Sequence, residues 1–200
     1  KDETEGIRIV HAAIDAGVNF LDNAWKYNNG RSEEFMGKAL QGGKRDKVFL
    51  MTKSDRRDKK GALSNLEDSL RRLRTDHLDL WQVHEIMQGD PTRVFGPDGA
   101  IEAFVQARRQ GKVRFLGFTG HTNPTYHLEM LQHDFEWDTV QMPLNPFDPH
   151  YLSFQKLVLP ELVKRKIGVI AMKTLAFGTL PKSGVVTSEE CWRYVWTLPV

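Results

Sequence analysis

Short apolar segments alternate with longer amphipathic segments along this 200-residue chain, and this alternation limits the fold more than any other feature. Apolar residues at helical spacing, such as Leu63, Leu66, Leu70 and Leu73, predict a helix in each longer segment. The short segments are typical of β-strands, at 18–22, 47–53, 77–84, 113–119, 139–143 and 168–172. Strands that alternate with helices form a parallel sheet, so the sequence predicts an α/β fold.

The predicted helices cover 7–17, 32–40, 63–73, 101–111, 124–133, 160–166 and 188–196. Ser32 and Ser188 stand at the starts of two of them and are predicted N-caps, because serine accepts a hydrogen bond from the first helical turn. The segment 88–99 is rich in Gly, Pro and Asp and is predicted to be a loop that borders a pocket.

A parallel sheet of this kind is either doubly wound or closed into a barrel, and two features favour the barrel. No Gly-x-Gly-x-x-Gly phosphate loop follows any predicted strand, so the signature of a dinucleotide-binding doubly wound fold is missing. Polar residues also follow several successive strands, where barrel enzymes place their catalytic groups. A (β/α)8 TIM barrel has eight strands and the sequence predicts six. We therefore expect residues 1–200 to form a single barrel domain that lacks the first and last strands.

The composition is that of a soluble globular protein, with 40% hydrophobic and 27% charged residues. A net charge of +2 is too small to indicate a nucleic-acid partner, and no apolar stretch approaches the ~20 residues that span a bilayer. The single cysteine, Cys191, excludes an internal disulfide and fits a reducing compartment, so the prediction is a cytoplasmic protein. His121, His127 and His133 are six residues apart and do not share a helix face, so no metal site is predicted.

Four residues at or just after predicted strand ends are the main candidates for catalysis: Asp22, Tyr27, Lys53 and His84. A tyrosine hydroxyl is a weak acid with an ordinary pKa near ~10. A nearby lysine ammonium favours its ionised form, and a carboxylate fixes the lysine. An imidazole then orients a substrate oxygen or passes a proton. Together these side chains predict a proton-donating site at the mouth of the barrel.

The contexts of these residues resemble the aldo-keto reductase family over nearly the whole chain, from about residue 5 to residue 200. The resemblance is carried by four segments: Asn19–Tyr27, Gly30–Glu34, Met51–Lys53 and Asp79–His84. The chain is most similar to a bacterial branch of the family with Thr-Gly-His after the fifth barrel strand and Met-Lys after the seventh. The resemblance implies an enzyme that reduces aldehyde or ketone carbonyls to alcohols with NADPH, or with NADH, and a small-molecule carbonyl substrate.

In that family the tyrosine donates a proton to the carbonyl oxygen, which here assigns the role to Tyr27. Lys53 and Asp22 would tune the tyrosine, and His84 would orient the carbonyl or help to move the proton. The protein's task is to position the cofactor, which carries the hydride chemistry.

The resemblance also implies cofactor-binding residues. Gln141 matches the glutamine that binds the nicotinamide amide, and Thr119 stands where the family usually has a serine with a similar contact. Met172 replaces a tyrosine that stacks on the nicotinamide ring, and a methionine can still pack against an aromatic ring. Lys173 is a candidate for a phosphate contact or for an ion pair with a carboxylate. Gly120 stands where many members have an asparagine, which removes one cofactor contact.

Other interpretations remain open from the sequence. A nucleotide-sensing or regulatory protein would keep the same fold with little turnover, and a defective fragment would have no function of its own. Lys53 lies in a basic run with Arg56 and Arg57 that is typical of a solvated loop. His84 alone is typical of a structural histidine, and His121 is a candidate pocket residue. The physiological substrate and the oligomeric state are not indicated.

Overall fold

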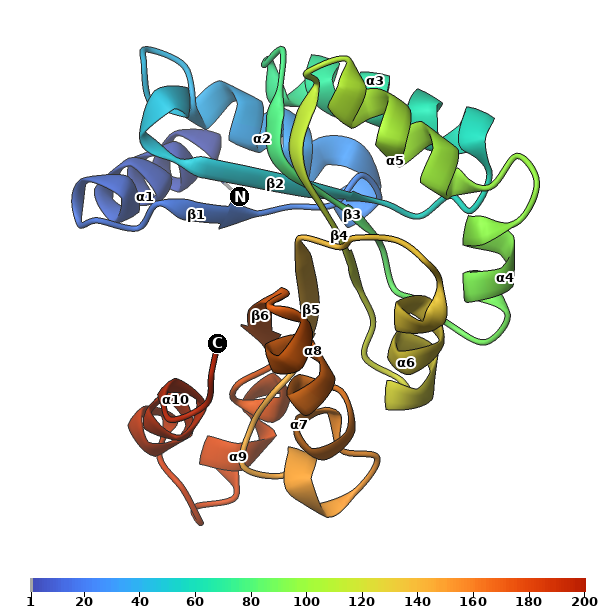
Figure 1. The fold of residues 1–200 in the computed structure, drawn as a ribbon. Coiled ribbons are helices and arrows are strands. Elements are labelled where there is room, and N and C mark those ends of the chain that lie inside the picture. The colour runs from blue at the N-terminus through green and yellow to red at the C-terminus, as the bar shows by residue number, and fades with distance from the viewer. Residues whose placement is uncertain (1) are drawn as a thin grey trace. The chain divides into compact units, whose positions relative to one another are not determined.

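The computed structural model describes residues 2–200, and its strands form a sheet in which each strand follows the previous one along the chain (Figure 1). The strands are β1 (Phe20–Asp22), β2 (Phe49–Ser54), β3 (Leu78–Val83), β4 (Val113–Thr119), β5 (Thr139–Pro143) and β6 (Gly168–Met172). Successive strands are separated by at least one helix, as parallel pairing requires. This confirms the predicted α/β class, and the βα repeat is that of a part of the (β/α)8 barrel.

The α-helices are α1 (Glu3–Asp15), α2 (Arg31–Ala39), α3 (Lys59–Leu73), α4 (Asp90–Phe95), α5 (Ala100–Arg109), α6 (Pro124–Gln132), α7 (Phe154–Leu157), α8 (Leu159–Arg165), α9 (Thr179–Lys182) and α10 (Ser188–Trp196). Short 3-10 helices cover Tyr27–Gly30, Arg45–Lys47, Asp148–His150 and Ala176–Gly178. No helix in residues 2–200 is long and apolar enough to cross a membrane.

The chain divides into two compact units. The first runs as far as His84 and includes Thr92–Leu116; the second comprises Glu85–Pro91 and Gly117–Val200. Each unit has its own buried apolar residues, so each is described by itself.

In the first unit, β2 pairs in parallel with β1 and with β3. Helices α3 and α5 lie side by side over these strands (Figure 1). Leu66 and Leu73 lie on the apolar face of α3 and are fully buried, as the helical spacing predicts. Burial of one leucine contributes about 1.5–3 kcal/mol, so this face is enough to fix the helix on the sheet. Trp81 on β3 stacks on Phe104 of α5 with ring centroids 3.8 Å apart, which makes Trp81 a core residue.

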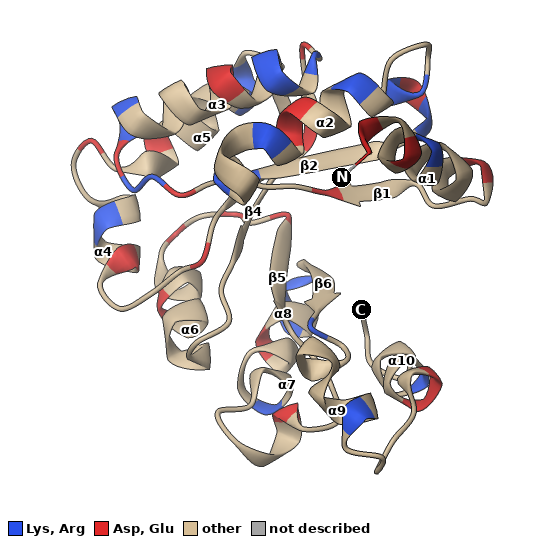
Figure 2. Ribbon diagram, turned by 180° about the vertical axis from the view of Figure 1, so that it is seen from behind, with Lys and Arg blue, Asp and Glu red and all other residues tan. Residues whose placement is uncertain are grey.

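Many charged residues of this unit lie on its helices, although Glu33, Lys53 and Asp79 are buried. Figure 2 shows basic and acidic residues along α1, α2 and α3. Several of them form pairs within one helix, such as Arg71 with Asp68 on α3 and Arg8 with Glu5 on α1. Such exposed pairs contribute little stability, roughly 0–1 kcal/mol each, so burial of the apolar face dominates.

In the second unit, β5 pairs in parallel with β4 and with β6. Its core contains a cluster of rings in which Phe118 of β4 lies 5.0 Å from Trp137 and 5.3 Å from His127 of α6. The His127 ring is fully buried and also meets Phe154 of α7 edge-on at 5.0 Å. Because this histidine is enclosed by aromatic rings, it packs as a core residue.

The predicted loop at 88–99 is wrong in part, because helix α4 occupies Asp90–Phe95. The Asp90 carboxylate accepts a hydrogen bond of 3.0 Å from the Met87 amide and fixes the turn that leads into the helix. Pro91 is compatible with a first helical turn, where no amide hydrogen is required. A proline and an aspartate that suggested a loop therefore mark a helix start.

Both predicted serine N-caps are also wrong by one or two residues. Helix α2 is preceded by Gly30 in the left-handed conformation, with a φ of 86°, and Ser32 already lies inside the helix. Helix α10 is capped by Thr187, whose side chain accepts from the Glu190 amide while Glu190 bonds back to Thr187. Ser188 is therefore the first helical residue, since a capping box requires the acid three residues after the cap.

Candidate active site

The residues after β1 continue to pair with β2 and so bring Asp22 close to Lys53. The Asn23 amide donates to the Met51 carbonyl at 3.1 Å, and the Trp25 amide donates to the Lys53 carbonyl at 3.0 Å. This backbone ladder runs past the end of the strand and fixes the start of the loop that carries Tyr27. The position of Lys53 on β2 therefore determines where that loop begins.

Lys53 is buried although it carries an ammonium group. Its side chain is 2% exposed, it forms an ion pair with Asp22, and its Nζ donates to the Asn23 carbonyl at 2.7 Å. Burial lowers the pKa of the Lys53 ammonium, and the Asp22 carboxylate acts in the opposite direction. A charged group this deeply buried is retained only where it is paired. The alternative in which Lys53 belongs to a solvated basic loop is therefore wrong.

Tyr27 lies in a tight turn next to this ammonium. The lysine Nζ is 5.2 Å from the centroid of the tyrosine ring, and the tyrosine is 39% exposed, so its ring can be reached from solvent. The two residues after it, Asn28 and Asn29, have positive φ values of 50° and 56°. Asparagine tolerates this left-handed region better than most residues. The asparagine pair allows the turn that places Tyr27 over Lys53.

His84 at the end of β3 meets Tyr27 edge-on, with ring centroids 5.6 Å apart and an interplanar angle of 78°. The histidine is 7% exposed. Its amide donates to the Ser54 carbonyl at 2.8 Å, and its carbonyl accepts from the Arg57 guanidinium at 2.7 Å. The structure thus brings all four predicted catalytic residues into one cluster in the first unit.

The sequence did not indicate two residues that hold this cluster. The basic run that contains Arg57 is typical of a solvated loop, yet Arg57 is partly buried and donates a hydrogen bond to the His84 carbonyl. Asn23 is buried, its side chain accepts from the Ala24 amide at 2.9 Å, and its carbonyl binds the Lys53 ammonium. The only signal for Asn23 was its place directly after Asp22. The contact of Arg57 joins residues 27 positions apart, which local patterns do not reveal.

The cluster has the chemical groups of a proton donor. A phenol that reaches solvent lies between an ammonium and an imidazole, and the ammonium is fixed by a carboxylate. In general, an ammonium near a phenol favours the phenolate form and so makes the hydroxyl a better acid. A substrate oxygen at the tyrosine would also be near the imidazole of His84, which can act as a hydrogen-bond donor.

The four predicted cofactor residues lie in the second unit: Thr119 and Met172 end their strands, Lys173 follows β6, and Gln141 lies within β5. Thr119 and Gln141 are register partners on β4 and β5 and are 3% and 4% exposed. Met172 ends β6 as the register partner of Pro143. Lys173 follows directly with a φ of 54°, and its Nζ lies 4.5 Å from the centroid of the Phe177 ring. The structure therefore brings a hydroxyl and an amide together on adjacent strands, with an ammonium after the third strand of the unit.

The absence of a side chain at Gly120 has a steric reason in the second unit. A Cβ built there would lie 2.7 Å from the Cε1 atom of His127 and 3.1 Å from the Ile86 carbonyl oxygen. Because both neighbours are close, the asparagine that many family members carry would not fit. The buried ring of His127 therefore lies in the space that a side chain at position 120 would need.

His121 was a candidate pocket residue, and its Nε2 lies 3.0 Å from the Glu85 carboxylate. Both side chains are about 30% exposed, so this is a partly solvated contact.

Burial lowers the pKa of Lys173, while the charge of Glu85 acts in the opposite direction. In residues 2–200, no group of three or more His, Cys, Asp and Glu side chains is placed to hold a metal ion.

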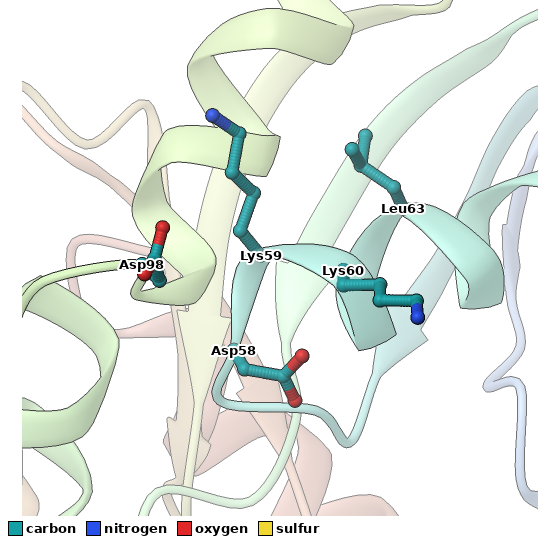
Figure 3. A pocket seen from close by; sticks show the side chains of 5 residues that line it. All are labelled: Asp58, Lys59, Lys60, Leu63 and Asp98. Carbon is teal, nitrogen blue, oxygen red and sulfur yellow. The ribbon is translucent and has the colours of Figure 1, made fainter.

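A separate pocket of about 440 Å³ lies at the start of α3 and is lined by Asp58, Lys59, Lys60, Leu63 and Asp98 (Figure 3). Two of its charged side chains make contacts within α3 and with α5. The Asp58 carboxylate caps the Gly61 amide at 2.7 Å, and Lys59, which extends toward α5 in Figure 3, pairs with Glu102 of that helix at 2.9 Å. The pocket is a consequence of capping and packing, and it is not a second active-site candidate.

The βα repeat and the Asp–Tyr–Lys–His cluster at the strand ends define a protein built on the (β/α)8 pattern. A model of the aldo/keto reductase family matches residues 1–190. The chain belongs to this family.

Individual relatives agree with this assignment. The chain is 31% identical to aldo-keto reductase YhdN of Bacillus subtilis over 199 residues, which cover 94% of this chain and 56% of that protein. Among solved structures, the holo form of aldo-keto reductase AKR11C1 from Bacillus halodurans has a TM-score of 0.76 and 30% identity, over 88% of this chain and 59% of that one.

An aldo-keto reductase from Klebsiella pneumoniae, solved in complex with NADPH, has a TM-score of 0.72 and 25% identity over 87% of this chain and 59% of that one. The chain therefore spans somewhat more than half the length of these relatives.

Proposed function

We propose that the protein reduces aldehyde or ketone carbonyls to alcohols with NADPH and that Tyr27 is the proton donor. The observation that carries this proposal is the ion pair between the buried Lys53 ammonium and the Asp22 carboxylate, next to the Tyr27 ring. An ion pair in this position has no evident structural purpose that an apolar pair would not serve equally well. It does supply a fixed positive charge where a tyrosine must give up a proton.

The residues of the second unit fit a nicotinamide cofactor. Gln141 and Thr119 are buried register partners on adjacent strands, and the amide and the hydroxyl can both donate to and accept from a carboxamide. The Lys173 ammonium offers a positive charge for a phosphate group. When bound, a reduced nicotinamide supplies a hydride to the substrate carbon. The relative from Klebsiella pneumoniae was solved with NADPH, which favours NADPH over NADH here.

Residues of the first unit then orient and protonate the carbonyl oxygen of the substrate. Tyr27 donates its phenolic proton to the oxygen as negative charge develops there. The ammonium of Lys53 stabilises the resulting phenolate, and Asp22 holds the ammonium in place. His84 donates a hydrogen bond to the same oxygen and so orients it toward the phenol.

The test is NADPH oxidation, followed by absorbance with a reactive aromatic aldehyde, in the wild type and in Tyr27→Phe. We expect turnover in the wild type and a loss of about 10²- to 10⁴-fold in the variant, the usual contribution of a positioned general acid. Tyr151→Phe is the matched control, because Tyr151 is 80% exposed. Equal turnover in all three proteins would remove Tyr27 from the mechanism. Tight NADPH binding with no turnover would instead favour a nucleotide-sensing protein.

We also propose that the protein works in the cytoplasm. The chain contains one cysteine, Cys191, which is buried and free, so the fold uses no internal disulfide. Fractionation of the source cells with an antibody to the protein would test this.

A further inference from the structure

One carboxylate of the first unit, that of Glu33 on α2, is completely buried. Its Oε1 accepts from the Thr52 hydroxyl at 2.6 Å and from the Ser69 hydroxyl at 2.7 Å. Its Oε2 accepts from Nη1 of Arg72 at 3.3 Å. A buried carboxylate with this many donors is fully hydrogen-bonded, and Arg72 is its counter-ion.

Arg72, on α3, connects this carboxylate to the loop that carries Tyr27. Its Nη1 also donates to the Trp25 carbonyl at 3.2 Å, and its guanidinium lies 5.1 Å from the centroid of the Trp25 ring. At the other end of the loop, a Cβ on Gly30 would be 2.5 Å from the Cζ atom of Arg72. The guanidinium therefore contacts the residues on both sides of the turn.

The Glu33 carboxylate is also connected to strand β2, next to Lys53. Thr52, which donates to Glu33, is the residue before Lys53. The Trp25 amide in turn donates to the Lys53 carbonyl. A closed path of contacts thus runs from the strand through Glu33 and Arg72 to the Tyr27 loop and back to the strand.

We propose that the Glu33–Arg72 pair is a positioning element of the active site that holds the Tyr27 loop at a fixed distance from Lys53. The role assigned to Tyr27 rests on the proposed function. Glu33 and Arg72 are not proposed to touch substrate or cofactor; they act through the loop. Replacement of a buried ion pair by apolar residues is often neutral or stabilising, so a role in stability alone would not explain a pair that clamps this loop.

The first variant is Arg72→Lys, with Arg71→Lys as the matched control on the same helix. Lysine keeps the positive charge beside Glu33, but it lacks the planar fork that stacks on Trp25 and reaches two acceptors at once. The side chain of Arg71 is 69% exposed and bonds only locally, to Asp68 in the preceding turn. Only Arg72→Lys alters the contacts with Glu33 and the Tyr27 loop. Both variants keep the helix and the net charge.

Two readouts are measured on the whole protein. Hydrogen exchange of the Trp25, Tyr27 and Asn29 amides, which are all hydrogen-bonded in the loop, reports positioning without any turnover. In Arg72→Lys we expect faster exchange in peptides that cover 23–30 and unchanged exchange elsewhere. We also expect a loss in kcat of about 10- to 100-fold, because a misplacement of about 1 Å at a reacting group costs this much. The KM for NADPH should change by less than about twofold, because its proposed ligands lie in the second unit.

The double variant Glu33→Gln/Arg72→Met covers the case in which Arg72→Lys does not fold. Glutamine still accepts from both hydroxyls, and methionine fills the space beside the indole ring without a charge. The proposal expects this variant to fold, to exchange faster at 23–30 than elsewhere in the chain and to lose kcat.

Wild-type exchange at 23–30 and wild-type kcat in the double variant would overturn the proposal, as would faster exchange spread over the whole chain. If the wild type shows no turnover, the reductase proposal fails. The exchange data then still decide whether the pair holds the loop.

Discussion

The clearest quantitative consequence of the structure is acid sensitivity caused by His127. Burial lowers the pKa of this imidazole from 6.5 to about 4, and the backbone of Gln141 acts in the opposite direction. In the unfolded chain the imidazole takes up a proton near its ordinary pKa, but in the folded protein it stays neutral. The stability that depends on the neutral ring is therefore fully present above pH 6.5 and is lost as the pH falls toward 4.

The magnitude follows from the difference of about 2.5 pH units between the two states. At about 1.4 kcal/mol per unit, the full loss is about 3.5 kcal/mol, and about 2 kcal/mol of it is gone by pH 5. That is a large part of the roughly 5–15 kcal/mol by which a domain is stable. One histidine therefore accounts for much of the expected acid lability.

The perturbation is His127→Phe, which keeps an aromatic ring against Phe118 and Phe154 and removes the titrating group. Urea unfolding at pH 7.5 and at pH 5 gives the free energy of unfolding at each pH. We expect the difference between the two to be smaller in the variant by about 2 kcal/mol. His150→Phe, at an exposed histidine, is the control and should follow the wild type. A variant that loses as much stability as the wild type between these pH values would refute the reasoning.

Three further results are expected. Gly30→Ala should destabilise the protein by more than about 2 kcal/mol in urea unfolding, because the left-handed backbone costs about 1–2 kcal/mol and the new methyl group meets the Arg72 guanidinium. Gly42→Ala, with a φ of 70° and open space around it, should show only the backbone cost. Equal losses in the two variants would contradict this account. Lys53→Met should lower NADPH oxidation while the urea midpoint changes little, because the Asp22 carboxylate that loses its partner is 36% exposed and can be solvated; a loss of stability as large as that of Asp79→Ala would contradict this. Asp79→Ala should cost about 3 kcal/mol or more, because a carboxylate that is 5% exposed holds two arginines and an amide; a loss below about 1 kcal/mol would be inconsistent with that network.

The alternation of apolar segments was sufficient to predict the strands and most helices, because apolar spacing and burial are the same physical property. The predicted catalytic residues Asp22, Lys53 and His84 could be found because each stands at or next to the end of such a segment. The start of α2 could not be predicted, since a glycine with positive φ takes the place of a side-chain cap. Helix α4 was missed because Asp and Pro are common both in loops and in first helical turns.

The residues that support the cluster were not predicted for a different reason. The contact between Arg72 and Glu33 spans 39 positions and the contact between Arg57 and His84 spans 27. Local spacing carries no information on such pairs. An arginine within a charged helix is typical of a solvated face, and only the fold shows that one of two adjacent arginines points inward.

The central claim is that Tyr27 delivers a proton while hydride passes to a carbonyl carbon, and isotope transfer tests it most directly. Benzaldehyde is incubated with NADPH that carries two deuterium atoms at C4, and the alcohol is analysed by mass spectrometry. The account predicts benzyl alcohol with one deuterium on carbon from the wild type, and at least 10²-fold less alcohol from Tyr27→Phe in the same time. Alcohol without deuterium, or equal amounts from both proteins, would contradict it.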